Sequence, residues 1–454
     1  MTIKVRNALQ ETLFFYKSVG GNIMNDILIF LASIVLVIVI GSIFKVNIGF
    51  VAIVFAYLLS VSVLDVSISE LFQIWPAKLF LIIFSISVFY SFASSNGAIE
   101  KLAIKFIYRF RTIPALIPIG IFIITVIIAG SGGGPYVATV VMAPITLKIA
   151  AISGMSPILG VIAVVCGASG ISLSQLSVVG QLVKGLIERT EYSEQASSLQ
   201  YMVFSNAMMF HTFIFILFYF IFKGYKLKPA IMEKPLAFTR EQTTSISVIA
   251  IVILLYLSPN LLGLIFPNNT VIELVRSKFD FTFAALIGAT ISFILKLGNE
   301  KEIFKKIPWS TLMLVTGMGL LVGVGEKCGI IQELAELVGT NVTPKLIPVM
   351  MAGCSGLMSF ISDGPGVVYP TLYPLVSGIA DVTGINPGLL FSAVSVGDST
   401  TVISPFSTGG AMFLSFVAQE KQREKMFMQF MIIPFVFLAI LIILISLKVF
   451  IYGV

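Results

Sequence analysis

The stretches Gly130-Ser131-Gly132-Gly133-Gly134-Pro135 and Ser362-Asp363-Gly364-Pro365-Gly366 both interrupt long apolar sequence. Around them, one pattern of helix-breaking and small polar residues occurs twice, 230 residues apart. Its members are Pro114, Pro118, Pro144, Gly154, Pro157, Gly167, Ser174, Ser177 and Gly180, then Pro344, Pro348, Pro374, Gly384, Pro387, Gly397, Ser404, Ser407 and Gly410. Duplicated apolar segments interrupted by Gly and Pro are the best sequence indication of a secondary transporter's binding site. The sequence therefore predicts a membrane carrier with its site between two repeats.

The composition indicates an integral membrane protein. Of the 454 residues, 57% are hydrophobic and only 11% are charged, which lies outside the range of soluble domains. Apolar runs of spanning length occur near 27–44, 48–64, 79–95, 200–222, 244–265, 279–297, 309–325 and 427–449. We expect a multi-pass protein of the inner cell membrane that contacts the lipid bilayer. The net charge of +7 does not indicate nucleic acid, because most basic residues lie in loops, where membrane orientation explains them.

The chain divides into two similar halves. We expect an all-α protein in which each repeat has five spans and one re-entrant helical hairpin. The predicted parts are an N-terminal interfacial segment at 1–26, repeat 1 at 27–222 with its hairpin at 114–150, a cytoplasmic linker at 223–243, and repeat 2 at 244–449 with its hairpin at 344–381. Because five is odd, the second repeat must enter the membrane from the opposite side.

The loop charges test this inverted arrangement. The loops predicted to be cytoplasmic hold 17 Lys and Arg, whereas those predicted to be outside hold 5. Loop 96–113 has four basic residues and one acid, but its counterpart at 326–343 has one Lys and three acids. The asymmetry predicts two repeats of opposite orientation. Only the N-terminus conflicts, because it would lie outside although it carries Lys4, Arg6 and Lys17.

The two hairpin tips are the first candidate site. Consecutive glycines in lipid would leave backbone groups unsatisfied, at a cost of several kcal/mol each. Non-helical backbone is tolerated at that depth only against protein or a watery cavity. Two tips at matching positions therefore indicate a binding role more than a merely structural turn. We assign substrate contacts in the tips to Ser131, Gly132, Gly133, Gly134, Ser362 and Gly364.

An interrupted span follows each hairpin, at 170–177 and at 398–410. Pro405 removes a backbone donor and breaks the helix there. Hydroxyls and freed carbonyls suit a small cation, and half-helix N-termini suit an anion. Close packing of membrane helices through Ser and Thr is the alternative explanation. We assign further substrate contacts to Ser174, Gln175, Ser404, Ser407 and Thr408.

Asp363 and Asp398 are the acids at the second tip and break. An intramembrane carboxylate is costly and marks a functional candidate. Either one suits cation coordination, proton transfer or the capping of a broken helix. The Na⁺ candidates are Ser131, Ser177, Asp363 and Asp398. Because no Lys or Arg lies at a tip or break, an anionic substrate would need helix dipoles, hydroxyls and a co-bound cation, so ion and substrate would strengthen each other's binding.

An enzyme is not indicated. Cys166, Cys328 and Cys354 lack metal-ligand spacing, and no nucleophile and base stand together beside the apolar spans. His211 lies mid-span, where it suits a hydrogen bond between helices or a proton relay. We expect no cofactor, only a coupling ion, with Na⁺ favoured over H⁺.

The tips and breaks resemble those of the ion transporter superfamily, most closely the MatC-type dicarboxylate carriers beside the divalent anion:sodium symporters. Residues 130–144 and 362–374 resemble the two hairpin tips of that superfamily. The run Ser404-Pro405-Phe406-Ser407-Thr408-Gly409-Gly410 matches the MatC-type pattern best, with Ser174-Gln175-Leu176-Ser177 as its weaker partner. The symporters carry Ser-Asn-Thr at both tips, where this chain has Ser-Gly-Gly and Ser-Asp-Gly. The resemblance covers roughly 27–449 and implies a homodimer with scaffold and transport domains, an elevator mechanism, and substrate and sodium sites at the tips and breaks.

The sequence thus predicts a secondary transporter of small organic anions, with dicarboxylates first, coupled to a cation. Two alternatives remain open. A cation/proton antiporter of the same superfamily would explain the two Asp residues without an organic substrate. The membrane subunit of a binding-protein-dependent carrier would need a partner protein.

Overall fold

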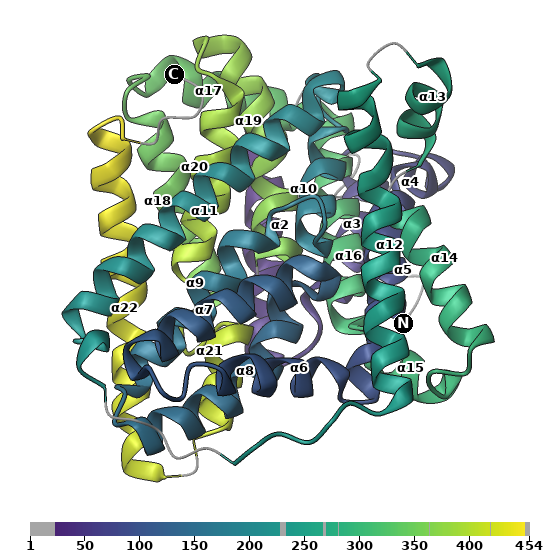
Figure 1. Cartoon of the computed structure of the whole chain (residues 1–454). Coiled ribbons are helices and arrows are strands. Elements are labelled where there is room, and N and C mark those ends of the chain that lie inside the picture. The colour runs from purple at the N-terminus through teal and green to yellow at the C-terminus, as the bar shows by residue number, and fades with distance from the viewer. Residues whose placement is uncertain are drawn as a thin grey trace, which may run out of the picture.

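The computed structural model describes residues 23–227, 233–266, 269–279, 281–362, 364–417 and 419–449, and every regular element in these ranges is helical (Figure 1). The predicted all-α class is confirmed. Helix α2 begins at Ile23, inside the predicted interfacial segment, and the rest of that segment lies outside the described residues.

The elements of the first half run from α2 to η4. They are α2 (Ile23–Phe44), α3 (Ile48–Ser62), α4 (Ile68–Ile74), α5 (Ala77–Ser95), α6 (Ala98–Tyr108), η1 (Pro114–Leu116), α7 (Ile117–Ile128), η2 (Ala129–Gly133), α8 (Gly134–Ser153), α9 (Pro157–Ser172), α10 (Val178–Ile187), η3 (Ser193–Gln195), α11 (Ala196–Ile221) and η4 (Gly224–Lys226).

The second half comprises α12 (Arg240–Ile265), α13 (Thr270–Lys278), α14 (Phe281–Ile294), α15 (Glu300–Lys306), α16 (Trp309–Lys327), α17 (Ile330–Asn341), α18 (Ile347–Ile361), η5 (Gly364–Val368), α19 (Tyr369–Thr383), α20 (Pro387–Thr400), α21 (Thr408–Ser415) and α22 (Glu420–Ser446). In the second half, α14 to α22 follow the order of α3 to α11, whereas α13 has no counterpart in the first half. Each of the eight predicted apolar runs became a helix, because apolar sequence of spanning length favours helix in a membrane, even through Pro259 of α12 and Pro434 of α22. These helices are α2, α3, α5, α11, α12, α14, α16 and α22.

Equivalent helices of the two halves pack reciprocally. Helix α5 packs against α14, and α16, the counterpart of α5, packs against α3, the counterpart of α14. In the same way α10 contacts α19, and α21 contacts α8. In each case, the helix of one half and its counterpart in the other half make equivalent contacts. Such reciprocal packing is expected when two similar units pack against each other.

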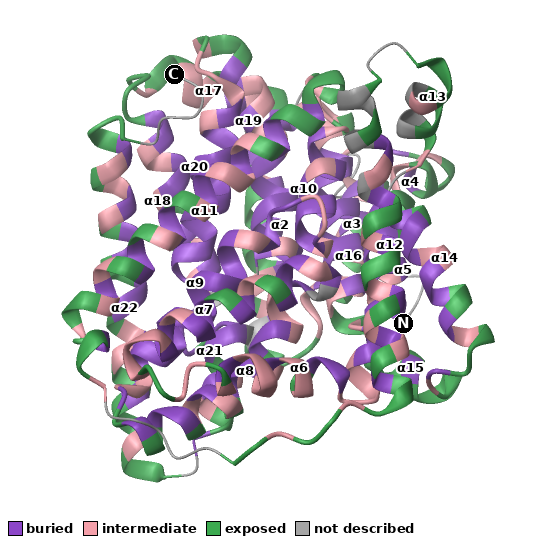
Figure 2. Cartoon of the chain, viewed as in Figure 1, coloured by how far each residue is buried: buried purple, intermediate pink, exposed green. Residues whose placement is uncertain are grey.

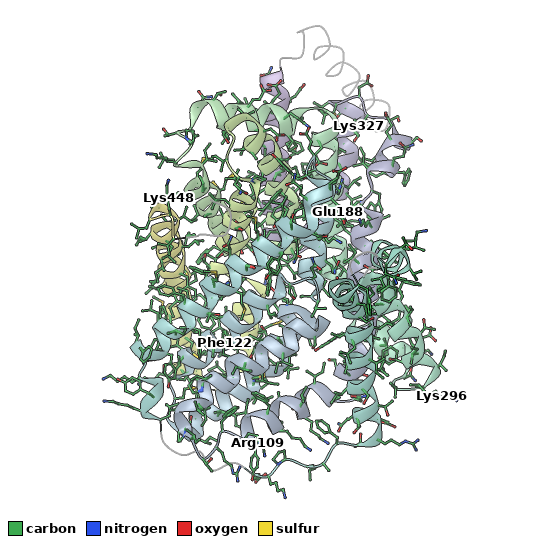
Figure 3. The ribbon with its side chains drawn as sticks, turned by 45° about the horizontal axis from the view of Figure 1, so that its top comes forward. Arg109, Phe122, Glu188, Lys296, Lys327 and Lys448 are labelled. Carbon is green, nitrogen blue, oxygen red and sulfur yellow. The ribbon has the colours of Figure 1, made fainter. Side chains whose placement is uncertain are left out.

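Equivalent elements also lie at opposite ends of the molecule. In Figure 1, α4 and α17 are near the top, whereas their counterparts α15 and α6 are near the bottom. Figure 3 shows the same separation for side chains, with Arg109 and Lys296 at the lower end and Lys327 at the upper end. The basic loop 96–113 and its acidic counterpart 326–343 thus occupy different ends of the protein.

The first hairpin lies close to its predicted bounds of 114–150. Its first arm consists of η1 and α7 and ends at Ile128, and in the turn η2 that follows, Gly132 has a non-helical conformation with φ 115°. The second arm, α8, covers Gly134–Ser153 and contains Pro144. Both α7 and α8 pack on α9, and the turn between them closes the hairpin.

Both interrupted spans are present. Helices α9 and α10 are separated by residues 173–177, and α20 and α21 by residues 401–407, which include Pro405. Asp398 lies in the last turn of α20, just before the break. The breaks put helix ends in the middle of the protein, where the sequence predicts the site.

The pattern of burial fits a multi-pass membrane protein. Six helices among the described residues are long and apolar enough to cross a bilayer. They cover Ala77–Ser95, Pro114–Gly132, Gly134–Ser153, Ser193–Ile221, Trp309–Lys327 and Glu420–Ser446. Figure 2 shows buried residues along the central helices and exposed ones along peripheral helices such as α12 and α22. Two hydrophobic cores form inside, one mainly from α2, α3, α4 and α16, and a larger one that contains the hairpins and interrupted spans.

Candidate functional site

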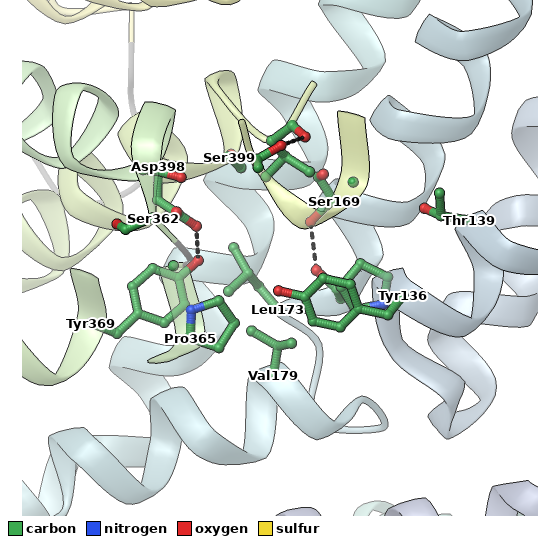
Figure 4. A pocket seen from close by; sticks show the side chains of 17 residues that line it. Tyr136, Thr139, Ser169, Leu173, Val179, Ser362, Pro365, Tyr369, Asp398 and Ser399 are labelled. Carbon is green, nitrogen blue, oxygen red and sulfur yellow. Dashed lines mark hydrogen bonds between the residues drawn. The ribbon is translucent and has the colours of Figure 1, made fainter. Parts of the chain in front are cut away.

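A polar cavity lies where the two hairpins meet the two interrupted spans. It has a volume of about 40 Å³. Its lining residues are Pro135, Tyr136, Thr139, Ser169, Ser172, Leu173, Val179, Ser359, Ser362, Gly364, Pro365, Tyr369, Asp398, Ser399, Val402, Ser407 and Gly409. In Figure 4, Tyr136 and Ser169 face Tyr369 and Asp398 across it, so both halves of the chain build the cavity.

The lining repeats the 230-residue offset of the sequence. Five pairs of lining residues are related by it. They are Pro135 and Pro365, Thr139 and Tyr369, Ser169 and Ser399, Ser172 and Val402, and Val179 and Gly409. Each repeat therefore contributes the same positions to one shared cavity.

Asp398 breaks this symmetry. Its counterpart at the 230-residue offset is Ala168, so only the second repeat supplies a carboxylate here. Asp398 is 3% exposed, and the Tyr369 hydroxyl donates a hydrogen bond to its Oδ2 at 2.7 Å (Figure 4). The Ser359 hydroxyl is a second neighbour of this carboxylate. None of the residues that line the cavity is Lys or Arg, so the carboxylate has no basic partner there.

Several helices begin at the cavity wall. The lining includes Pro135 in the first turn of α8, Val179 in that of α10 and Gly409 in that of α21. It also includes Pro365 in η5, which leads into α19. Free N–H groups and partial positive charge at these helix ends favour an anion. The cavity thus combines an environment for an anion with a carboxylate suited to a cation.

In the second break, the predicted serines already have protein partners. Ser404 donates to the Phe360 carbonyl at 2.6 Å and thereby ties the break to the arm α18. Ser407 donates to the Val402 carbonyl at 2.5 Å and accepts from the Gly410 amide at 3.2 Å, so it caps α21. Ser407 lines the cavity, whereas Ser404 lies behind the lining. Thr408 is the first residue of α21.

The corresponding serines of the first break differ. The hydroxyls of Ser174 and Ser177 are buried and have no hydrogen-bond partner in the described part of the chain. Gln181 donates to the Gln175 carbonyl at 2.5 Å, which stabilises the loosened backbone. The Gln175 side chain accepts from Tyr256 of α12 at 3.3 Å, and Gln175 is not among the residues that line the polar cavity. A buried hydroxyl without a partner at a helix break can bind a water or a cation.

The first tip is fixed by α5. Tyr90 contacts the Ser131 hydroxyl at 2.7 Å and donates to the Ile128 carbonyl at 2.9 Å. Gly132 and Gly134 have φ values of 115° and 68°, which L side chains rarely adopt. Gly133, between them, ends η2. In the second tip, Ser362 and Gly364 line the polar cavity, whereas Asp363 lies outside the described residues.

A larger chamber adjoins the polar cavity. It has a volume of about 350 Å³ and includes Gly132 and Gly134 of the first tip. Four residues line both spaces, which places them side by side; they are Pro135, Tyr136, Val179 and Pro365. The chamber walls come mainly from α5, α8 and α10.

Several site residues were missed by the sequence reasoning. Thr139, Tyr369, Ser169 and Ser399 follow the 230-residue offset, and that signal was available to find them. Nothing in the sequence pattern singles out Tyr90, because its role depends on how α5 meets the first tip. Sequence reasoning did single out His211, whose Nε2 lies 2.8 Å from the Ser399 hydroxyl. This is the expected hydrogen bond between helices, from α11 to α20.

Comparison with known proteins gives matches to carriers and transporters. Residues 24–172 match the model of the dicarboxylate carrier protein MatC N-terminus. Uncharacterized transporters from Mycobacterium tuberculosis and Mycobacterium bovis are each 28% identical over 110 residues, 23% of this chain and 25% of theirs. The matched part thus spans about a quarter of these relatives.

A likeness also exists to a solved structure, that of the YdaH transporter from Alcanivorax borkumensis. It has a TM-score of 0.53 at 14% identity over 86% of this chain and 90% of that one, which speaks for the fold alone. The match of residues 24–172 to the MatC model confirms the predicted resemblance to MatC-type carriers. The matched proteins are named as carriers or transporters, in agreement with the expectation that the chain is not an enzyme.

Proposed function

We propose that this protein is a secondary transporter that carries a small organic anion, with dicarboxylates as the leading class, together with a cation. One observation carries the proposal: a single cavity between the repeats combines several helix N-termini with one buried carboxylate. The match to a dicarboxylate carrier family supports the substrate class.

The anion would bind through backbone and hydroxyl groups. The starts of α8, α10 and α21 surround the cavity, and Ser169, Ser172 and Ser362 supply hydroxyls. Such groups attract a carboxylate without a Lys or Arg. Their attraction alone is modest, at about 1 kcal/mol for each helix terminus, so a cation bound beside the anion would strengthen it.

The cation would bind at Asp398. A buried ionised carboxylate without a basic partner costs several kcal/mol, and a bound Na⁺ or a proton removes that cost. Sodium is favoured as the coupling ion because the hydroxyls of Tyr369 and Ser359 adjoin the carboxylate. Ser177, with its orphaned hydroxyl, and Ser131 do not line this cavity, and they would be cation ligands at the first break and tip. Since cation and anion each neutralise the other, their binding is coupled, as a symporter requires.

The repeats would insert with opposite orientation and exchange access by an elevator movement. The reciprocal packing of equivalent helices and their location at opposite ends of the molecule support the inversion, and so does the charge of the loops. The separate core around α3 and α16 supports a scaffold against which the hairpins and interrupted spans move. From the resemblance to MatC-type carriers we also propose a homodimer in the inner cell membrane.

Reconstitution of the purified protein tests this proposal. Proteoliposomes are given radiolabelled succinate under an imposed Na⁺ gradient or, separately, an imposed pH gradient. Uptake that requires one of these gradients, and that falls at least tenfold in Asp398→Asn, supports coupled transport. Asp65→Asn is the matched control, because Asp65 is exposed and its φ of 51° also suits Asn.

Other results would favour the alternatives. Exchange of Na⁺ for protons without any organic anion would indicate the antiporter. Uptake that appears only after a soluble binding protein is added would indicate a partner-dependent membrane subunit. Full uptake by Asp398→Asn would contradict the proposed cation site.

A further inference from the structure

We infer that the transported anion has an extended apolar body, which lies in the 350 Å³ chamber while a carboxylate end lies in the polar cavity. The inference rests on the proposed function and defines the class of substrate within it. Compact dicarboxylates would then be poorer substrates than acids with a hydrocarbon chain or ring.

The sizes of the two spaces lead to this division. The polar cavity, at about 40 Å³, holds an ion or about three water molecules. Sites for organic molecules usually measure about 300–1,000 Å³. The adjoining chamber, at about 350 Å³, reaches that range. The bulk of an organic anion therefore fits the chamber and not the polar cavity.

The two spaces lie side by side, separated by no more than the four residues that they share. Pro135, Tyr136, Val179 and Pro365 line both, and they come from the two tips and the start of α10. A molecule with its carboxylate at the tips would extend past Tyr136 and Val179 into the chamber. Its charged end would then meet the helix N-termini, and its body would meet the chamber walls.

The chamber walls are suited to hydrocarbon. Helix α8 contributes Val137, Val140 and Val141, and α10 contributes Val178 and Leu182. From α5, Ser91 also lines the chamber, but its hydroxyl already donates to the Ser87 carbonyl at 2.7 Å. Each methylene that moves from water into such walls strengthens binding about fourfold. Affinity for the chamber should therefore increase with the length of the substrate's hydrocarbon chain.

Lys306 gives the chamber its positive charge. Among the described residues it is the only basic one that lines either space, and it is exposed at the end of α15. Its Nζ donates to the Ser94 carbonyl at 3.1 Å, which holds it beside the end of α5. An exposed ammonium attracts anions over a distance set by the salt concentration. Lys306 would thus attract the anion into the chamber. It would also pair with a second carboxylate at the far end of the substrate.

Binding of two linear dicarboxylates tests the inference. Succinate and suberate carry the same charge, but suberate has four more methylenes. Equilibrium binding to the purified protein, in the presence of the coupling ion, is expected to be at least tenfold tighter for suberate. Lys306→Gln should weaken both severalfold in low salt and less in high salt.

Substitutions in the chamber separate the two ligands. Val140→Phe fills the chamber and should weaken suberate at least tenfold while succinate changes by less than about twofold. Ile152→Phe is the matched control, since both residues lie on α8 and both are 44% exposed. Val141→Thr keeps the volume but adds a hydroxyl, and it should reduce the preference for suberate even if Val140→Phe fails to fold.

The outcomes distinguish this inference from the proposed function. Equal binding of succinate and suberate, with both altered alike by Val140→Phe, would mean that the chamber is only clearance between moving helices, and the inference would be overturned. Failure to bind or transport any organic anion under either ion gradient would instead overturn the proposed function.

Discussion

Gly364 lies so close to Asp398 that a Cβ on the glycine would stand 2.2 Å from both carboxylate oxygens. The second hairpin tip therefore rests directly on the carboxylate of the polar cavity. No other residue type fits there without displacing the tip or the carboxylate. Because the two groups touch, a cation that binds at Asp398 and the position of the tip must influence each other. This contact joins the second hairpin tip directly to the proposed cation site.

Gly364→Ala should therefore weaken the proposed binding of Na⁺. The added methyl group must displace either the tip or the Asp398 carboxylate, so we expect Na⁺ to bind at least tenfold more weakly. The measurement is the rise in Tm of the purified protein with NaCl, compared with choline chloride at equal ionic strength.

Gly353→Ala is the matched control, because it changes a glycine of the same hairpin arm where a Cβ would meet nothing within 4 Å. That change should leave the sodium response intact and stabilise α18 by up to about 1 kcal/mol. An unchanged sodium response in Gly364→Ala would show that the tip contact has no part in ion binding.

The serines of the two breaks should respond differently to removal of their hydroxyls. Ser407→Ala loses the cap of α21 and should lower the free energy of unfolding by about 1 kcal/mol. Ser177→Ala removes a hydroxyl without a partner among the described residues, so its stability in ion-free buffer should change less. Thermal unfolding of both variants in detergent measures the difference.

Sodium then adds a second test of Ser177. If its hydroxyl is a ligand, Ser177→Ala should lose part of the stabilisation by sodium that the wild type shows. A larger loss of stability in Ser177→Ala than in Ser407→Ala, in ion-free buffer, would contradict the assignment of their partners.

Much of the fold was predictable because its determinants are local. Apolar runs give membrane helices, Gly and Pro give breaks, and both signals are read directly from residues such as Pro405 and Gly132. The repeat was also visible, since a fixed offset preserves the positions where the chain must break. Helix ends were less predictable: α8 ends at Ser153, three residues beyond the predicted end of the first hairpin at 150.

The site was less predictable because it depends on contacts between distant segments. Ser174 and Ser404 are equivalent in the sequence, yet only Ser404 meets a carbonyl, that of Phe360. The partner of Asp398 is Tyr369, which the sequence pattern did not select, and it reaches the carboxylate from the second hairpin. One difference between the repeats was visible in the sequence: the second repeat has Asp398 at the position where the first repeat has Ala168.

Glu70 provides a prediction for pH. Its hydrogen bond from the Lys327 ammonium, at 2.7 Å, and that from Ser67 lower the pKa of Glu70 from 4.5 to about 2. A lowered pKa means that the carboxylate stabilises the folded state above pH 4.5 and loses this effect as the pH falls toward 2. The difference in Tm between wild type and Glu70→Gln should be constant near neutral pH and shrink below 4.5.

An exposed acid serves as the comparison for Glu70. Glu336 has no ion pair among the described residues, so Glu336→Gln should show little difference from wild type at any of these pH values. A difference for Glu70→Gln that grows on acidification would contradict the sign of the pKa shift.

The ion pair of Arg189 with Glu326 tests the proposed movement. Arg189 follows α10, Glu326 lies near the end of α16, and their Nη2 and Oε2 atoms are 3.6 Å apart. A second pair joins Lys78 of α5 to Glu188. Both pairs would have to break if α10 moves with the hairpins against α5 and α16. A partly exposed pair contributes up to about 1 kcal/mol, so Arg189→Gln should shift the balance of conformations about two- to fivefold.

The balance of conformations can be measured by labelling. Ser91 lines the chamber, so Ser91→Cys reacts with a membrane-impermeant maleimide at a rate that depends on how open the chamber is. The uptake rate is measured alongside. Arg189→Gln and Glu326→Gln should change the labelling rate in the same direction, because each removes the same pair. Lys305→Gln is the control, since the pair of Lys305 with Glu302 at 2.9 Å lies within one helix and survives any rigid movement. If the two variants label like Lys305→Gln, then α10 and α16 belong to the same rigid body, and the boundary of the moving domain must lie elsewhere.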